Sequence, residues 1–395
     1  MTLTTTEVER LRAETRGVAN CVHLNNAGAG LMPQPVIDAV CAHVRLEADI
    51  GGYEAAAREE ARCADVYAQV AALIGAQPRE IALLENATVA WQLAFYAQKL
   101  GPGDRILTAR AEYAANYVAF LQQAERTGCV IEVIPDGPDG ATDPVALQDM
   151  IDDRVRLIAI THIPTNGGLV NPAAEIGAIA NRRGIPYLLD ACQTVGQMPV
   201  DVDELGCDFL SATGRKFLRG PRGTGFLYVR EKWLDTIEPP MIDHFGAEWT
   251  AADAYTLRAD ARRFETWENS YALRLGLGVA AEYASNIGLD AIQERAFGLA
   301  SDLRAELSAI PGVEVKDIGS QRCAIVTFAA DQADAATIKV AMSEAGVNVS
   351  TSSPASTRLD AEARGLPIVV RVSPHYYNTE TEIERFLSKL KSVLG

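Results

Sequence analysis

Short apolar runs alternate with helical patterns between residues 75 and 229, and this alternation constrains the fold more than any other feature. Strand-like runs cover residues 81–84, 105–108, 130–134, 157–161, 187–189, 208–211 and 225–229. Several are continuously apolar, as is typical of parallel strands that are buried on both faces. Helical patterns separate them at residues 89–99, 116–126 and 173–183. The alternation predicts an α/β fold with a mostly parallel central sheet, in which ligands bind at the carboxyl ends of strands.

The pattern changes after residue 229. Two prolines at 239 and 240 begin a loop-rich stretch that runs to about residue 269. Helical patterns then cover 270–286, 289–309, 335–345 and 379–393, with short strands near 313–315, 324–328 and 368–372. A chain of 395 residues is long enough for two hydrophobic cores. We therefore expect a large domain over residues 19–269 and a smaller α+β domain formed by residues 1–18 and 270–395.

Composition excludes several classes of protein. The net charge of −16 argues against a general nucleic-acid binder, because phosphate neutralisation requires an excess of Lys and Arg. No apolar run approaches the length of a membrane span, and the N-terminus lacks the basic and apolar regions of a signal peptide. The seven cysteines are scattered without a CxxC pair, so neither a disulfide framework nor a metal site is predicted. These features predict a cytoplasmic protein without membrane or nucleic-acid partners.

Lys216 and Asp190 are the residues that most constrain function. Lys216 lies in a Gly-rich loop that follows a predicted strand, and Asp190 ends the apolar run Pro186-Tyr-Leu-Leu-Asp190. A pyridoxal phosphate (PLP) enzyme needs a lysine that forms an imine with the cofactor and an acid that keeps its pyridine nitrogen protonated. Each residue also has a simpler interpretation. Asp190 could cap a helix, and Lys216 could belong to a solvated basic loop.

A third segment, Asn86-Ala-Thr88, follows a strand and begins a helix. Free backbone N–H groups at a helix N-terminus bind phosphate well, and the Thr88 hydroxyl could add a further hydrogen bond. The alternative is an ordinary N-cap formed by Asn86 or Thr88.

Taken in order, these segments resemble the class V aminotransferase family of fold type I PLP enzymes, which includes cysteine desulfurases, isopenicillin N epimerase and C–S lyases. The resemblance covers most of the chain and includes His23-Leu-Asn-Asn-Ala-Gly28, Thr213-Gly-Arg-Lys216 and Val370-Arg-Val-Ser. It implies that Lys216 and Asp190 are catalytic. The cofactor contacts that it implies are Ala87, Thr88, Tyr113, Asn166, Asp190, Gln193, Thr213, Arg215, Lys216 and Thr266.

The resemblance also assigns roles to individual contacts. Asn166 and Gln193 would lie near the phenolic oxygen of the cofactor, and Thr266 would reach the phosphate in the partner subunit of a homodimer. Arg371 would bind the substrate carboxylate, for which the guanidinium fork is suited, although a structural salt bridge is the alternative. Asn25 and Tyr53 are further substrate contacts that the resemblance implies, and a packed aromatic is the alternative interpretation of Tyr53.

Three departures from the desulfurase pattern carry information. Residues 346–356, which match the loop that bears the nucleophilic Cys in desulfurases, contain no Cys. Cys192 is interpreted as a structural thiol because it follows Asp190 on a packed turn. Ala114 stands in the segment Glu112-Tyr-Ala-Ala-Asn116 where desulfurases place a ring-stacking His, so Tyr113 is expected to supply the ring face. Arg215 replaces a His beside the lysine.

The missing Cys argues against persulfide transfer. The resemblance then implies, as the first expectation, a PLP-dependent C–S β-lyase that acts on an S-substituted cysteine or its S-oxide. The expected products are a thiol or sulfenate, pyruvate and ammonia. An amino-acid epimerase, an aminotransferase and a decarboxylating enzyme on the same scaffold are the alternatives, and the S-substituent stays open. A non-enzymatic module that binds a phosphorylated ligand would have little use for an imine-forming lysine with an acid for the pyridine nitrogen.

Overall fold

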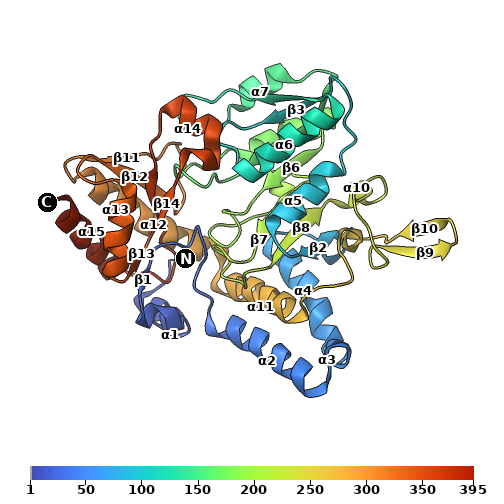
Figure 1. Cartoon of the computed structure of the whole chain (residues 1–395), viewed down its shortest axis with the longest axis horizontal. Helices are drawn as coiled ribbons and strands as arrows, with labels where there is room; N and C mark the ends of the chain where they lie inside the picture. Colours follow the sequence, from blue (N-terminus) through green and yellow to red (C-terminus); the bar gives the residue numbers. More distant parts are fainter. Residues whose placement is uncertain (1) are drawn as a thin grey trace.

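A seven-stranded sheet forms the centre of the molecule in the computed structural model, which describes residues 2–395 (Figure 1). The strand order is β2-β8-β7-β6-β5-β3-β4, and β8 runs in the direction opposite to the other six strands. The strands are β2 (Ile81–Leu84), β3 (Arg105–Thr108), β4 (Val130–Val133), β5 (Val155–Thr161), β6 (Tyr187–Asp190), β7 (Phe209–Thr213) and β8 (Gly225–Val229). The predicted α/β fold with a mostly parallel sheet is confirmed.

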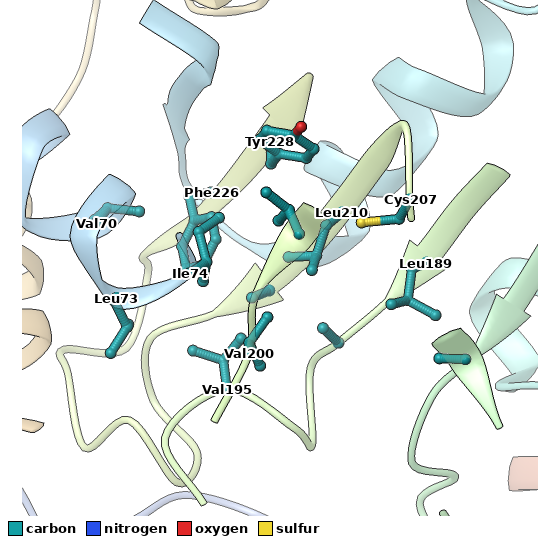
Figure 2. Close-up of a cluster of buried hydrophobic side chains, with 14 of the residues drawn as sticks. Val70, Leu73, Ile74, Leu189, Val195, Val200, Cys207, Leu210, Phe226 and Tyr228 are labelled. Atoms are coloured by element: carbon teal, nitrogen blue, oxygen red, sulfur yellow. The ribbon is translucent and has the colours of Figure 1, made fainter. Parts of the chain in front are cut away.

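Helices cover both faces of this sheet. The helices α5 (Ala87–Tyr96) and α6 (Ala114–Thr127) pack on one face, and α4 (Glu60–Leu73), α8 (Ala173–Arg183) and α11 (Tyr271–Ile287) pack on the other. Successive side chains of a strand point to opposite faces, so Leu188 and Leu189 of β6 belong to different clusters. Figure 2 shows part of the cluster that contains Leu189, to which Val70 and Leu73 of α4 and Leu210 and Phe226 of the sheet also belong.

A second, antiparallel sheet lies beside the first and has the order β11-β12-β15-β14. Its strands are β11 (Val313–Val315), β12 (Val326–Ala330), β14 (Ser350–Ser352) and β15 (Val369–Val372). A separate cluster of buried side chains joins it to α12 (Leu289–Ser308), α13 (Ala335–Glu344) and α15 (Glu380–Leu394). The two clusters on the large sheet and the separate cluster at the second sheet agree with one core for each sheet, and the exact domain boundaries stay a prediction.

The N-terminus lies against the C-terminal part of the chain. Helix α1 (Thr5–Ala13) places Arg12 Nη1 at 2.8 Å from the Tyr377 carbonyl oxygen and 3.0 Å from a carboxylate oxygen of Glu382. Strand β1 (Val22–His23) then pairs in parallel with β13 (Val347–Asn348). These contacts tie the N-terminal segment to the C-terminal part of the chain.

The structure adds elements that the sequence patterns do not predict. Residues 34–73 form α2 (Gln34–Ile50), α3 (Gly52–Arg58) and α4. The stretch interpreted as loop-rich contains a hairpin of β9 (Ala247–Ala251) and β10 (Ala254–Leu257), which projects from the body of the molecule (Figure 1). Most of its side chains are exposed, so it lacks the one-sided apolar alternation that marks a packed strand.

Two further observations concern the described residues as a whole. No helix within residues 2–395 is long and apolar enough to cross a membrane. All seven cysteines lie in this range, and each of them is a free thiol.

Candidate active site

Asp190 and Lys216 come together at one edge of the large sheet. Asp190 is the last residue of β6, and Lys216 follows the end of the neighbouring strand β7 by three residues. The two strands are parallel, so their carboxyl ends meet at the same edge. Burial lowers the pKa of Lys216, with Arg215 and Arg371 acting in the same direction and Asp190 opposing them. A lysine in this environment gives up its proton more readily than a solvated one.

Asp190 is held from two sides. Its Oδ2 accepts a hydrogen bond of 2.9 Å from the Asn116 amide, and its Oδ1 accepts one of 2.9 Å from the backbone N–H of Cys192. The Asp190 side chain is buried. The helix-cap interpretation fails because no helix begins directly after this residue. A carboxylate has room for further donors after these two bonds, so a pyridinium N–H can still be accepted.

The segment Asn86-Ala-Thr88 begins α5, and both of its interpretations describe part of what it does. Asn86 caps the helix, because its Oδ1 accepts from the Val89 N–H at 2.9 Å. The N–H groups of Ala87 and Thr88 have no intrahelical acceptor at this position in a helix. They therefore remain able to bind an anion, and the helix dipole favours its negative charge.

A glycine allows this helix to approach the sheet closely. A Cβ on Gly225 of β8 would lie 2.7 Å from the Asn86 carbonyl carbon and 2.9 Å from the Ala87 nitrogen. Thr213 is buried nearby and donates a hydrogen bond to the Thr224 carbonyl at 3.3 Å. The start of α5 is thus packed directly on the strands that lead to and from the lysine loop.

Two buried amides near these groups each have an unsatisfied oxygen. Asn166 donates from Nδ2 to the Thr357 hydroxyl at 3.4 Å, and Gln193 donates from Nε2 to the Ala27 carbonyl at 3.2 Å. Their remaining side-chain oxygens are buried without a partner. A buried polar atom without a partner is costly. These residues therefore fit a bound group with its own polar atoms.

Arg371 of β15 brings a cation from the second sheet. Its Nη1 donates to the Thr165 hydroxyl at 2.7 Å and to the Thr165 carbonyl at 3.2 Å, whereas Nε has no partner. Burial, followed by the charge of Arg215, lowers the pKa of Arg371 to about 10. No carboxylate pairs with this guanidinium among the described residues, so the salt-bridge interpretation fails and a substrate anion is a suitable partner.

The lysine loop is bound to the N-terminal segment. Arg215 donates from Nη1 to the Gly28 carbonyl, and the Gly30 N–H donates to the Arg215 carbonyl at 2.8 Å. Asn25 lies in the same segment, where it bridges to Ser373, and its buried Oδ1 has no partner. The N-terminal segment therefore passes next to Lys216.

Arg219 anchors this loop to the N-terminal segment through its buried side chain. It is 1% exposed and has a φ of 61°, which is uncommon for a residue other than glycine. Its Nε donates to the Leu31 carbonyl and its Nη2 to the Thr15 hydroxyl, each at 2.6 Å. The Arg219 guanidinium also lies 4.3 Å from the centroid of the Tyr377 ring. The sequence patterns do not single out Arg219 from the other cations of the loop.

The remaining predicted residues divide into two groups. Tyr113 lies at the site, with its ring centroid 6.0 Å from Lys216 Nζ. Tyr53 is 75% exposed on α3, at the far end of α2 from the lysine loop, and Thr266 is half-buried in a surface segment (Figure 1). The chain by itself does not bring Tyr53 and Thr266 to Lys216.

Comparison with protein families agrees with this geometry. The family model described as aminotransferase class-V matches residues 22–386. The chain therefore belongs to the class V aminotransferase family, and it is a PLP-dependent enzyme. The predicted family, enzyme class and cofactor are confirmed.

Several curated proteins are similar along nearly their whole length. "Probable cysteine desulfurase" of Methanothermobacter thermautotrophicus is 29% identical over 98% of both chains. A Xylella fastidiosa protein of the same name is 32% identical, covering 99% of this chain and 97% of its own. "Cysteine desulfurase" of an Enterobacter species is 31% identical, with 98% of each chain covered.

Solved structures show the same fold at lower identity. The apo structure of a cysteine desulfurase from Thermococcus onnurineus has a TM-score of 0.91 and 24% identity, covering 100% of this chain and 99% of its own. The cystine C–S lyase C-DES, in complex with its product cysteine persulfide, has a TM-score of 0.84 and 22% identity, covering 95% and 99%.

The close approach at Gly225 generates a prediction about cofactor binding. In Gly225→Ala the new methyl group must displace the start of α5, because its nearest neighbours are backbone atoms. We expect the dissociation constant of PLP, measured by equilibrium dialysis of the apoenzyme, to rise about tenfold or more. Gly298→Ala is the matched control, since a Cβ at this position in α12 meets nothing within 4 Å. Equal affinities in the two variants would contradict the role of this contact.

Proposed function

We propose that the protein is a PLP-dependent C–S β-lyase that acts on an S-substituted cysteine. The observation that carries the proposal is the composition of the segment beside Arg371. Strand β14 pairs with β15 so that Ser350 lies opposite Arg371, and the turn after β14 brings Thr357 to Asn166. This segment offers hydroxyl groups and no thiol, so it provides no nucleophile to carry a persulfide.

Cys192 does not supply the missing nucleophile. Burial, followed by the negative charge of Asp190, raises the pKa of its thiol well above the usual value. The thiolate is the reactive form of cysteine, so a thiol that stays protonated attacks sulfur poorly. This environment supports the interpretation of Cys192 as a structural residue.

We assign the cofactor-binding roles as follows. The N–H groups of Ala87 and Thr88, together with Thr213 and Arg215, would hold the phosphate, and Thr266 would reach it from a partner subunit. Asp190 would accept the pyridine N–H, Asn166 and Gln193 would hydrogen-bond the phenolic oxygen, and Tyr113 would lie against the ring. When bound, PLP supplies an aldehyde that condenses with amino groups and a ring that withdraws electrons from the substrate Cα.

The residues of the chain then perform an elimination. Arg371 binds the substrate carboxylate through its guanidinium fork, with Asn25 as a further contact. Lys216 Nζ takes the Cα proton, which its lowered pKa allows. The Cβ–S bond breaks, and sulfur leaves with the electron pair as a thiolate or sulfenate. Water then hydrolyses the three-carbon remainder to pyruvate and ammonia.

Desulfuration of free cysteine is the second candidate, because the similar proteins are named cysteine desulfurases. That reaction leaves alanine rather than pyruvate and requires an acceptor for the sulfur atom. An epimerase would return the proton to the opposite face of Cα and would require a second acid or base there. Elimination, desulfuration and epimerisation leave different products, so product analysis can distinguish them.

Product analysis tests the proposed reaction. With S-alkyl cysteines or cystine as substrate, we expect pyruvate, ammonia and the sulfur product in equal amounts, measured by coupled assay and mass spectrometry. Free cysteine is tested in parallel. Alanine as the main carbon product would support desulfuration instead. Inversion at Cα with deuterium uptake from D₂O, and no pyruvate, would show an epimerase.

Trapping with borohydride tests the role of Lys216. Reduction of the holoenzyme should fix the cofactor on the peptide that contains residue 216, and mass spectrometry should locate it there. Lys216→Ala should lose this label and the long-wavelength absorbance of the lysine-bound cofactor, and kcat should fall by about 10²- to 10⁴-fold. Lys339→Ala, at an exposed lysine of α13, is the control and should behave as the wild type. Label on another lysine would refute the assignment.

We also propose that the active enzyme is a homodimer in which Tyr53 and Thr266 serve the site of the partner subunit. Co-expression of two inactive variants tests this arrangement, using Lys216→Ala in one chain and Thr266→Glu in the other. A mixed dimer would contain one site with both residues intact, so random pairing should restore about a quarter of the wild-type activity. No recovery, or a fully active monomer in sedimentation, would contradict the shared site.

A further inference from the structure

Glu112 is a buried acid to which the proposed reaction assigns no role. It immediately precedes Tyr113, the N-cap residue of α6, and is 3% exposed. Its Oε1 accepts hydrogen bonds from the Tyr113 N–H and the Asn116 amide, each at 2.9 Å, and from the Thr161 hydroxyl. Its Oε2 accepts from the Thr161 N–H at 3.0 Å and from the Thr108 hydroxyl at 3.3 Å. Two backbone N–H groups and the NH₂ group of Asn116, all of which can only donate, thus converge on this carboxylate.

The Asn116 amide lies between two carboxylates. Its Nδ2 is 2.9 Å from Glu112 Oε1 and 2.9 Å from Asp190 Oδ2. An amide NH₂ has two hydrogens, so one can be donated to each acid. Thr161 and Asp190 are paired residues at the ends of β5 and β6. Because Glu112 accepts a hydrogen bond from the Thr161 N–H, its carboxylate lies at the same sheet edge as Asp190.

This arrangement determines which end of the amide faces Asp190. If the Asn116 side chain turned by half a turn, its carbonyl oxygen would face two carboxylates, and both contacts would become repulsive. Glu112 therefore penalises the wrong orientation and keeps the NH₂ group directed at Asp190. Its own charge adds a second negative potential in a buried environment, where such interactions are strong.

We infer that Glu112 is a positioning residue for Asp190: it acts through Asn116 to fix the Asp190 carboxylate, and its charge favours the proton on the pyridine nitrogen. Glu112 touches neither substrate nor cofactor in this scheme. The inference rests on the proposed role of Asp190 as the partner of that nitrogen.

The environment of Glu112 determines the conditions for a test. Burial raises the pKa of Glu112 to about 7, with the negative charge of Asp190 adding to the effect and the hydrogen bonds from Thr161 and Asn116 opposing it. Measurements at pH 8.5 therefore compare an ionised Glu112 with its substitution. At this pH a Gln at the position removes the charge and places an NH₂ against groups that donate.

The test uses Glu112→Gln in the holoenzyme loaded with PLP that carries ¹⁵N in its ring. The ¹⁵N chemical shift reports directly whether the pyridine nitrogen is protonated. We expect a protonated nitrogen in the wild type and a shift toward the unprotonated value in Glu112→Gln. We further expect kcat to fall about tenfold or more with KM changed less than about twofold, since the effect is on the chemical step.

Two further variants separate positioning from general damage. Glu175→Gln is the matched control on an exposed residue of α8 and should leave the ¹⁵N shift and kcat unchanged. Asn116→Ala removes the bridge and should itself shift the ¹⁵N signal. In the Asn116→Ala background, Glu112→Gln should then have a much smaller effect, because interacting residues are not additive. Asn116→Ala keeps the inference testable even if Glu112→Gln fails to fold.

The outcomes are distinguishable. An unchanged ¹⁵N shift in a folded Glu112→Gln enzyme would overturn the inference while leaving the role of Asp190 intact. A Glu112→Gln effect of full size in the Asn116→Ala background would show that Asn116 does not transmit it, which also refutes the inference. An unprotonated nitrogen in the wild type would instead refute the proposed role of Asp190.

Discussion

The arrangement of the site depends on the hydrogen bonds of one buried residue, Arg219. Its backbone N–H donates to the Lys216 carbonyl at 3.0 Å. Its guanidinium donates to Thr15 and Leu31 in the N-terminal segment and to Tyr376 in the C-terminal segment. A buried cation must be well hydrogen-bonded, so three parts of the chain that are distant in sequence are drawn to one point. The lysine loop is consequently tied to both the N-terminal and the C-terminal segments of the chain.

The large sheet positions a second group of residues. The adjacent strands β5, β6 and β7 end at Thr161, Asp190 and Thr213, so the backbone hydrogen bonds of the sheet set the spacing of these residues. The second sheet contributes Arg371 from outside this frame. A substrate whose carboxylate binds Arg371 would therefore be positioned by the second sheet, while its Cα would face residues held by the large sheet.

Local sequence predicts the parts of this structure that local physics controls. Strands β2, β3 and β8 have the predicted bounds because each is a short run between turn residues. The hairpin of β9 and β10 is absent from the prediction because its exposed side chains carry no alternation. Asp190 and Lys216 are predictable from strand ends, whereas the Asn116 bridge depends on contact between a helix and a strand 74 residues apart. Tyr53 and Thr266 lie away from Lys216, where sequence similarity alone suggests a role.

Cys192 has a consequence for an enzyme that handles sulfur. A released sulfenate or persulfide can form a disulfide with an ionised cysteine nearby, with loss of hydroxide or hydrosulfide. Cys192 lies two residues after Asp190, which accepts a hydrogen bond from its backbone N–H, and burial together with that acid raises the pKa of its thiol. In the proposed scheme, the acid that pairs with the cofactor also keeps the neighbouring thiol protonated, which lowers the reactivity of that thiol toward a released sulfur product.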